Sequence, residues 1–120
     1  MARLKSRTDF LRAAKGVRRV MPSLTLELCA SPEPCPRQVR VGFTASRKVG
    51  NAVTRNRAKR RLRAAAAAVL PLYGLEGNDY VLVARPDTLK RPFAELLGDL
   101  TTAVGAAHIR LAQRTAKGPL

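Results

Sequence analysis

Residues 46–71 read SRKVGNAVTRNRAKRRLRAAAAAVLP, and the other elements of the chain are best interpreted relative to them. Asn51 is a favourable helix N-cap, because its side-chain oxygen can accept a hydrogen bond from a free amide of the first turn. From Ala52 onward the residues are good helix formers, with neither Gly nor Pro before Pro71. Because proline interrupts helical hydrogen bonding, we expect the helix to end there. The sequence therefore predicts a helix of about nineteen residues, roughly 28 Å long.

The two sides of this predicted helix differ in chemistry. At about 100° per residue, small and apolar side chains fall on one narrow stripe, while the opposite side is almost purely cationic. The narrow stripe would let the helix lie close to the rest of the protein. The stripe contains Thr54, Ala58, Leu62, Ala65 and Val69, and the polar side contains Asn56, Arg57, Lys59, Arg60 and Arg63, with Arg55 and Arg61 on its flanks.

Charge repulsion on the cationic side indicates a polyanionic partner. A solvated helix face normally mixes both signs, because like charges four residues apart repel each other. Three like pairs occur here without a nearby carboxylate: Arg55/Lys59, Arg57/Arg61 and Lys59/Arg63. A plain solvated face is the alternative, but a phosphate backbone would neutralise the repulsion and is favoured.

The composition of the whole chain leads to the same class of partner. The 120 residues include 23 Lys and Arg against 8 Asp and Glu, which gives a formal charge of +15. This balance is typical of nucleic-acid-binding proteins and, less often, of proteins that bind anionic membranes. The length fits one domain with a modest core. Since no long apolar run or signal peptide is visible, we expect a cytoplasmic protein without a membrane segment.

The residues before the basic helix predict one helix and three strands. A helix over Ser6–Lys15 would begin at the capping-box-like Ser-Arg-Thr-Asp and end at Gly16. Val17–Val20 would form a short irregular strand. Leu24–Leu28 and Val39–Phe43 alternate with period two, and the Pro-rich loop between them favours an antiparallel pair.

The residues after the basic helix predict a strand and a final helix. Asp79–Ala84 is almost continuously apolar, as expected of a central strand that is covered on both faces. Strand, helix and strand in succession imply a parallel crossover, which the general rule makes right-handed. Pro92 suits the first position of a helix whose apolar residues recur at helical spacing to Leu111, so this helix would cover the core. Residues 115–120 are expected to be a frayed tail.

Motifs for catalysis by the protein itself are missing from the sequence. The acidic residues are scattered and form no metal-binding motif such as D-x-D. The single histidine, His108, falls on the final helix, where packing is favoured over catalysis. Cys29 and Cys35 match no zinc-ligand spacing, and we interpret them as inert thiols. Gly50 leads into a helix N-terminus, and it is either a plain turn or part of a phosphate site.

The string KVGNAVTRNRAKRRLR, residues 48–63, resembles the signature of the bacterial ribonuclease P protein component. In that family an Arg-Asn-Arg triplet on a basic helix follows a Lys-x-Gly-Asn-Ala-Val turn, and Arg55, Asn56 and Arg57 supply the triplet here. The resemblance implies one α+β domain over residues 1–120, with the order α-β-β-β-α-β-α and a small mixed sheet. It also implies a left-handed crossover, against the general rule.

The resemblance further implies a function within an enzyme. In bacterial ribonuclease P the RNA subunit carries out the magnesium-dependent hydrolysis that removes the 5′ leader of precursor tRNA. The protein component binds this RNA and the leader. The chain would therefore belong to an endoribonuclease without being catalytic alone, and Mg²⁺ would be held chiefly by the RNA. No obligate protein partner and no membrane are implied.

A surface that binds ribonuclease P RNA is implied at the basic helix and the loop that enters it. Arginine suits this role because its planar fork can engage a phosphate through two hydrogen bonds. The implied residues are Ser46, Arg47, Lys48, Asn51, Arg55, Asn56, Arg57, Lys59, Arg60, Arg61 and Arg63.

A second surface, for the leader, is implied in the cleft between the first helix and the sheet. We assign Phe10 and Arg40 to it, and Phe10 would either stack on a base or anchor its helix in the core. Family members often carry a second aromatic residue where this chain has Ala14. They frequently have aromatic strand residues where it has Leu24, Leu26 and Leu28. We therefore expect leader stacking to be weaker here.

Two other classes of nucleic-acid-binding protein have a similar composition. A ribosomal or other structural RNA-binding protein would explain the composition equally well, but not the unbroken SRKVGNAVTRNR string. A DNA-binding protein with the basic helix in a major groove is disfavoured, because cations surround the helix too broadly for a few base contacts.

Overall fold

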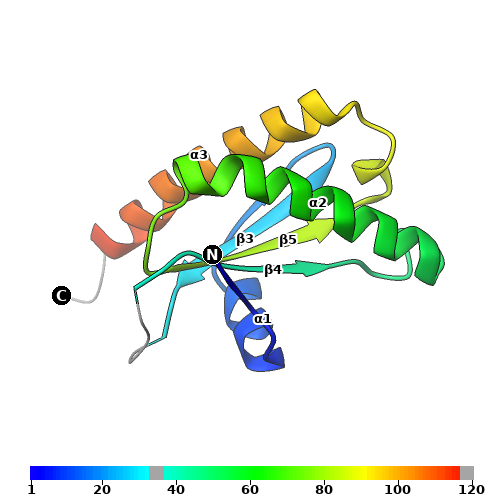
Figure 1. The fold of residues 1–120 in the computed structure, drawn as a ribbon. Coiled ribbons are helices and arrows are strands. Elements are labelled where there is room, and N and C mark those ends of the chain that lie inside the picture. The colour runs from blue at the N-terminus through cyan, green and yellow to red at the C-terminus, as the bar shows by residue number, and fades with distance from the viewer. Residues whose placement is uncertain (33–36, 117–120) are drawn as a thin grey trace.

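The computed structural model describes residues 1–32 and 37–116, which fold as a mixed five-stranded sheet and three α-helices (Figure 1). The helix predicted to fray at residue 115 continues to Ala116, while residues 117–120 and Cys35 lie outside the described ranges. The elements are β1 (Ala2–Arg3), α1 (Arg7–Ala14), β2 (Val17–Val20), β3 (Leu24–Ala30), β4 (Arg40–Thr44), α2 (Ala52–Tyr73), β5 (Asn78–Ala84), the 3-10 turn η1 (Pro86–Thr88) and α3 (Phe93–Ala116).

The order of the strands across the sheet is β1-β4-β5-β3-β2. The central strand, β5, runs parallel to β4 and antiparallel to β3. The predicted direct pairing of β3 with β4 is therefore wrong, because β5 lies between them. The continuous apolar run of β5 explains this position, since both of its faces are covered only at the centre of the sheet. The short strand β1, which the sequence did not predict, pairs with β4 at one edge.

The connection from β4 through α2 to β5 has the hand that the family resemblance implies. In Figure 1, β4 lies in front of β5, both arrows point the same way, and α2 passes above them. This arrangement makes the crossover left-handed. It places α2 beside α3 on one face of the sheet and leaves α1 on the other (Figure 1).

The two faces of the sheet carry two separate apolar clusters. Under α2 and α3, β3 and β5 contribute fully buried side chains to the main core, among them Leu26, Tyr80 and Leu82. Under α1, a smaller cluster joins Ala13 to Val81, to Leu4 directly after β1, and to Cys29 of β3. Alternation along the strands assigns successive residues to opposite clusters.

Helix α2 begins as predicted but ends later. The Asn51 side chain accepts a hydrogen bond from the Thr54 amide at 2.9 Å, which confirms the N-cap. Pro71, predicted to end the helix, lies inside it, and the helix continues to Tyr73 over 22 residues. In the last turn a proline removes one hydrogen bond, worth about 1 kcal/mol. Burial of Leu70 on the core side offsets this loss.

Helix α1 is capped by Ser6, whose hydroxyl accepts a hydrogen bond from the Thr8 amide at 3.2 Å. Gly16 follows the helix as predicted, but its backbone is not in the left-handed conformation of a typical C-terminal glycine. A Cβ at this position would collide with the carbonyl oxygen of Leu28 on β3. Gly16 is therefore required by the close approach of two segments. Helix α3 begins at Phe93, one residue after the predicted Pro92 start.

Candidate nucleic-acid interface

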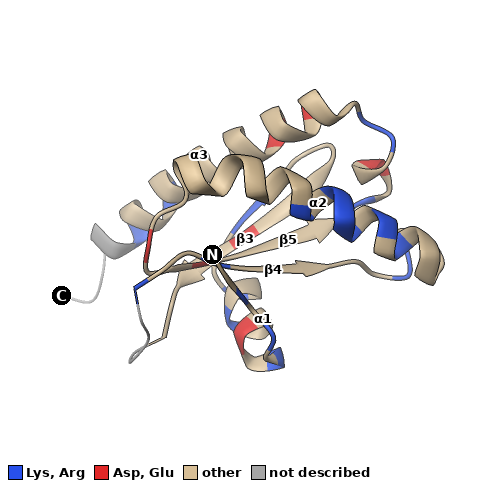
Figure 2. Cartoon of the chain, viewed as in Figure 1, with Lys and Arg blue, Asp and Glu red and all other residues tan. Residues whose placement is uncertain are grey.

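The cations of α2 gather in its N-terminal half and in the loop that enters it (Figure 2). The C-terminal half, from Ala64 to Tyr73, contains no Lys or Arg. The narrow apolar stripe is buried as predicted from Ala58 to Val69, while Thr54 is half-buried. Because the stripe holds the helix against the sheet, the opposite side faces solvent. The exposed residues of the predicted surface are Ser46, Arg47, Lys48, Asn51, Asn56, Arg57, Arg60 and Arg63.

A polar hollow of about 210 Å³ lies between the end of β4 and the first turns of α2. Arg55 and Lys59 contribute its two cations, and Asn56 lies at its border. The Nε atom of Arg55 is buried and has no hydrogen-bond partner. A buried donor without an acceptor costs about 1–3 kcal/mol. The two cations in its polar lining give the hollow the chemistry of an anion site.

A second hollow of about 220 Å³ lies on the other side of Asn56. It is lined by Val53, Asn56, Arg57 and Arg60, and the side chain of Val53 is 66% exposed. An apolar side chain beside two guanidinium groups offers contacts to a nucleobase as well as to a phosphate. Asn56 borders both hollows, so an RNA strand crossing α2 can contact it from either side.

Arg61 differs from the other predicted cations of α2, because it contacts the protein itself. Its guanidinium donates to the carbonyl oxygen of Thr88 at 2.6 Å and lies over the Phe93 ring, 5.8 Å from its centroid. These contacts tie α2 to η1 and to the start of α3. Sequence spacing alone placed Arg61 on the flank of the helix and gave no sign of these partners.

The loop that enters α2 is a compact turn. The Val49 amide donates to the Ser46 carbonyl at 3.1 Å, and the Gly50 amide donates to the Arg47 carbonyl at 3.2 Å. Gly50 has φ of 147°, and a Cβ there would lie 2.8 Å from Cγ2 of Thr54. Glycine is therefore needed for the turn itself. The turn holds Arg47 and Lys48 in solvent beside the first turn of α2.

Phe10, predicted for the leader cleft, is half-buried between α1 and the sheet. Its ring lies so close to Gly42 that a Cβ there would be 2.7 Å from Cε1 and Cζ. The ring also packs with the smaller cluster of Leu4 and Val81. Phe10 therefore anchors α1, which is one of the two roles predicted for it.

Arg40, the other residue assigned to the cleft, lies between two carboxylates. Its guanidinium is 2.8 Å from Asp9 and 3.4 Å from Asp79, and its side chain is 12% exposed. Asp79 is fully buried and accepts a hydrogen bond from Ser31 at 2.6 Å. Hydrogen bonds from Arg12 and Arg40 hold the pKa of Asp9 below its ordinary value. This ionic network fastens α1 to β4 and β5.

The sheet face beside α1 continues into a hollow of about 360 Å³, which we call the open groove. It joins the two predicted surfaces, because it reaches from the strands to the loop that enters α2. Its cations on β2 and after β5 were missed by the sequence analysis. The open groove is lined by Arg18, Val20, Thr25, Ser46, Lys48, Val49, Val83, Ala84, Arg85 and Pro86.

The strand residues expected to face the leader lie on the other side of the sheet. Leu24, Leu26 and Leu28 are fully buried in the main core under α2 and α3. The residues of β3 on the α1 side are Thr25 and Glu27. The expectation for the three leucines is wrong, because period-two alternation places them opposite α1. The same alternation was the signal that could have identified Thr25 and Glu27.

Two other groups considered for chemistry are structural. His108 Nε2 lies 2.6 Å from the hydroxyl of Tyr80, which also accepts a hydrogen bond from the Leu75 amide at 2.8 Å. Burial lowers the pKa of His108. Cys29 is buried, and its pKa is raised to about 11, chiefly by that burial. These observations confirm the packing role of His108, and the burial of Cys29 is consistent with the inert thiol predicted for it.

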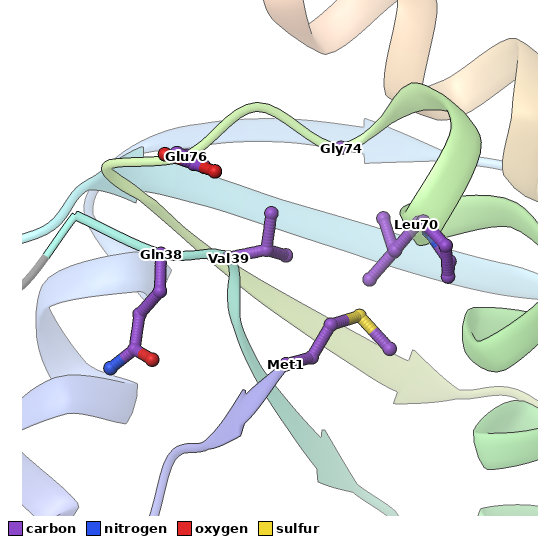
Figure 3. Close-up of a pocket in the computed structure, with 7 residues that line it drawn as sticks. Met1, Gln38, Val39, Leu70, Gly74 and Glu76 are labelled. Carbon is purple, nitrogen blue, oxygen red and sulfur yellow. The ribbon is translucent and has the colours of Figure 1, made fainter.

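The opposite end of α2 has a hollow of different character (Figure 3). Its volume is about 370 Å³, and neither Lys nor Arg lines it. Its lining residues are Met1, Gln38, Val39, Leu70, Pro71, Gly74 and Glu76. Within residues 1–32 and 37–116, no three His, Cys, Asp or Glu side chains are grouped as a metal site. Over the same ranges, no helix is long and apolar enough to cross a bilayer.

A cationic helix beside an open sheet face, on a small α+β domain, defines an RNA-binding protein. The sequence profile of the ribonuclease P family, described as Ribonuclease P, matches residues 1–108. The chain therefore belongs to this family, and its role in the processing of precursor tRNA follows from that membership. The alternative of a ribosomal RNA-binding protein is not favoured.

Individual relatives and structures agree with this assignment. The ribonuclease P protein component of Ruegeria pomeroyi is 51% identical over 106 residues, covering 88% of this chain and 85% of the relative. That of Gluconacetobacter diazotrophicus is 44% identical over 112 residues, covering 92% and 95%. The RNase P protein of Staphylococcus aureus superposes with a TM-score of 0.72 at 25% identity, covering 89% of this chain and 95% of that structure. The Thermotoga maritima protein, at 22% identity and a TM-score of 0.70, covers 87% and 96% and shares the fold.

Proposed function

We propose that the N-terminal half of α2 and its entering loop bind the RNA subunit of ribonuclease P, and that the 5′ leader of precursor tRNA lies along the open groove. The observation that carries this proposal is the polar hollow lined by Arg55 and Lys59, two cations one turn apart on the same helix. A phosphate group bound there would pair with both cations. The exposed cations around it supply further contacts to the same backbone.

The two surfaces have complementary tasks. Phosphate contacts along α2 fix the position of the RNA subunit without reading its sequence. The groove is bordered by Lys48 and Arg18 and has Val83 in its lining, so a single strand can place phosphates on the rim and bases inside. Phe10, which anchors α1, offers the remaining edge of its ring to a base at the end of the groove.

We further propose that the RNA subunit catalyses the hydrolysis and holds the Mg²⁺ ions that it needs. The protein contributes positive charge where two polyanions, the RNA subunit and its substrate, must approach each other. Neutralising that repulsion raises the affinity for the substrate and lowers the concentration of Mg²⁺ required. This work would take place in the cytoplasm, where tRNA precursors are made.

A reconstitution at low Mg²⁺ tests the proposal. Precursor tRNA is incubated with the protein, with bacterial ribonuclease P RNA, and with both, and cleavage at the mature 5′ end is measured. We expect cleavage only with both. The Arg57→Ala variant should require several-fold more protein, because one phosphate contact is lost. The matched control Arg110→Ala, which removes an exposed cation from α3, should behave as the unaltered protein does. Equal effects of the two variants would refute the assignment to α2.

A further inference from the structure

Glu27 lies on the α1 side of the sheet, next to the open groove. Its neighbours across the strands are Arg18 on β2 and Val81 on β5. Thr25, two residues earlier on the same face of β3, lines the groove together with Arg18. Glu27 is half-buried. Its carboxylate is therefore placed among the groups that a strand in the groove would meet.

Glu27 differs from the other carboxylates on this face, because the charge of Arg18 acts on it but no arginine of the described residues lies close enough to form an ion pair. Asp9 and Asp79 both form ion pairs with arginine side chains. Among the described residues, Glu27 forms neither an ion pair nor a side-chain hydrogen bond. Burial raises its pKa, and the charge of Arg18 opposes this shift only in part. A half-buried acceptor without a donor is costly and is stabilised by a ligand that supplies donors.

The chemistry of a carboxylate determines which part of an RNA strand it can contact. Phosphate groups are repelled, so a base edge must face Glu27. An ionised carboxylate only accepts hydrogen bonds, through two parallel oxygens. Guanine presents two adjacent donors, N1–H and N2–H, on its Watson–Crick edge. Uracil has one N–H between two carbonyl oxygens, while adenine and cytosine each place an acceptor nitrogen beside their amino group.

We propose that Glu27 determines base specificity in the leader, by accepting two hydrogen bonds from a guanine held in the open groove. The inference rests on the proposed function, because it requires the leader to lie along this face. Val83, which lines the groove, gives the guanine ring an apolar floor, and Arg18 and Lys48 remain available to the flanking phosphates. In single-stranded RNA the Watson–Crick edge is free to be read in this way.

Competition within a pool of precursor tRNAs with randomised leaders tests the inference in the reconstituted holoenzyme. We expect the unaltered protein to favour guanine at one leader position by about tenfold, the effect of a good bidentate contact. In the Glu27→Gln variant one acceptor is replaced by a donor, which matches the amino group and the ring-nitrogen acceptor that adenine and cytosine share. The preference should therefore move from guanine to these two bases at the same position. The Glu27→Ala variant should show no preference there.

Glu95→Gln is the matched control, since Glu95 is exposed in the first turn of α3. This variant should keep the guanine preference. Thermal melting of each variant shows whether it is folded. A preference that is absent in the unaltered protein, or that is unchanged by both substitutions at Glu27, would overturn the inference while the protein still stimulated cleavage. A protein that gave no stimulation with any leader would overturn the proposed function instead.

Discussion

The two halves of α2 share one buried stripe and differ on every other side. In the N-terminal half, Ala52–Arg63, the outer surface is cationic and is bordered by two hollows that contain arginine. In the C-terminal half, Ala64–Tyr73, the outer residues are alanines and then the exposed Leu72 and Tyr73. The nearby hollow contains no cation. Packing and charge are thus encoded on different sides of one helix, and only the N-terminal half carries the cations that we propose to bind RNA.

The largest expected effect concerns the stripe that both halves share. Leu62 lies beneath the cationic half and Leu70 beneath the other, and both are fully buried. Replacing either by alanine should lower the free energy of unfolding by about 2–5 kcal/mol, because a buried side chain is lost and a cavity remains. Denaturant unfolding measures this. Leu62→Ala should lower RNA binding only as far as its unfolded fraction accounts for. A larger loss would contradict the separation of packing from recognition.

A smaller effect is expected from the chemistry of the cationic half. Arg55→Lys keeps the charge of α2 but removes the Nε donor and the planar fork. RNA affinity should fall about tenfold, the equivalent of 1.4 kcal/mol, which is within the range of a charge-assisted hydrogen bond. Filter binding at several salt concentrations measures the loss.

The C-terminal half of α2 provides the matched control for Arg55→Lys. Ala68→Lys adds a cation at an exposed position of that half. Its RNA affinity should stay within about twofold of the unaltered protein, because screening limits the reach of a surface charge to about 10 Å. A gain by Ala68→Lys as large as the loss by Arg55→Lys would mean that net charge alone governs binding.

The smallest expected effect is a dependence of stability on pH, which arises at the turn after the C-terminal half of α2. The Tyr80 hydroxyl accepts a hydrogen bond from the Leu75 amide and lies 2.6 Å from Nε2 of His108. Because the folded pKa of His108 lies below its ordinary value of 6.5, the unfolded chain takes up the proton first. The stabilisation is fully present above pH 6.5 and is lost as the pH falls through the folded pKa. Melting temperatures between pH 7.5 and pH 5 should fall more steeply for the unaltered protein than for His108→Gln.

Local features of the fold could be predicted from the sequence, because their causes lie within a few residues. The Asn51 cap and the buried stripe of α2 needed only helical spacing, and the apolar run of β5 identified the central strand. The pairing of β3 with β5, by contrast, joins residues about 50 positions apart. No local sequence pattern indicates that β5 inserts between β3 and β4, so the predicted pairing of these two strands was wrong.

The residues of the candidate site could be proposed from the sequence, but the role of each residue could not. The cations of α2 were identified by their spacing, and three of the six are exposed: Arg57, Arg60 and Arg63. The contact of Arg61 with Thr88 and the enclosure of Arg40 by Asp9 and Asp79 depend on distant partners. Charge alone does not distinguish a side chain that faces a ligand from one that holds two elements together.

The central position of β5 also determines when the sheet can be completed during synthesis. Its two neighbours, β3 and β4, leave the ribosome first, and neither can pair with the other in the final arrangement. The position between these two strands in the sheet remains unfilled until residues 78–84 have been synthesised. Since domains are assembled as units while the chain is made, the cationic helix is synthesised before the sheet that supports it exists. The sheet therefore cannot close around β5 before residues 78–84 have been synthesised.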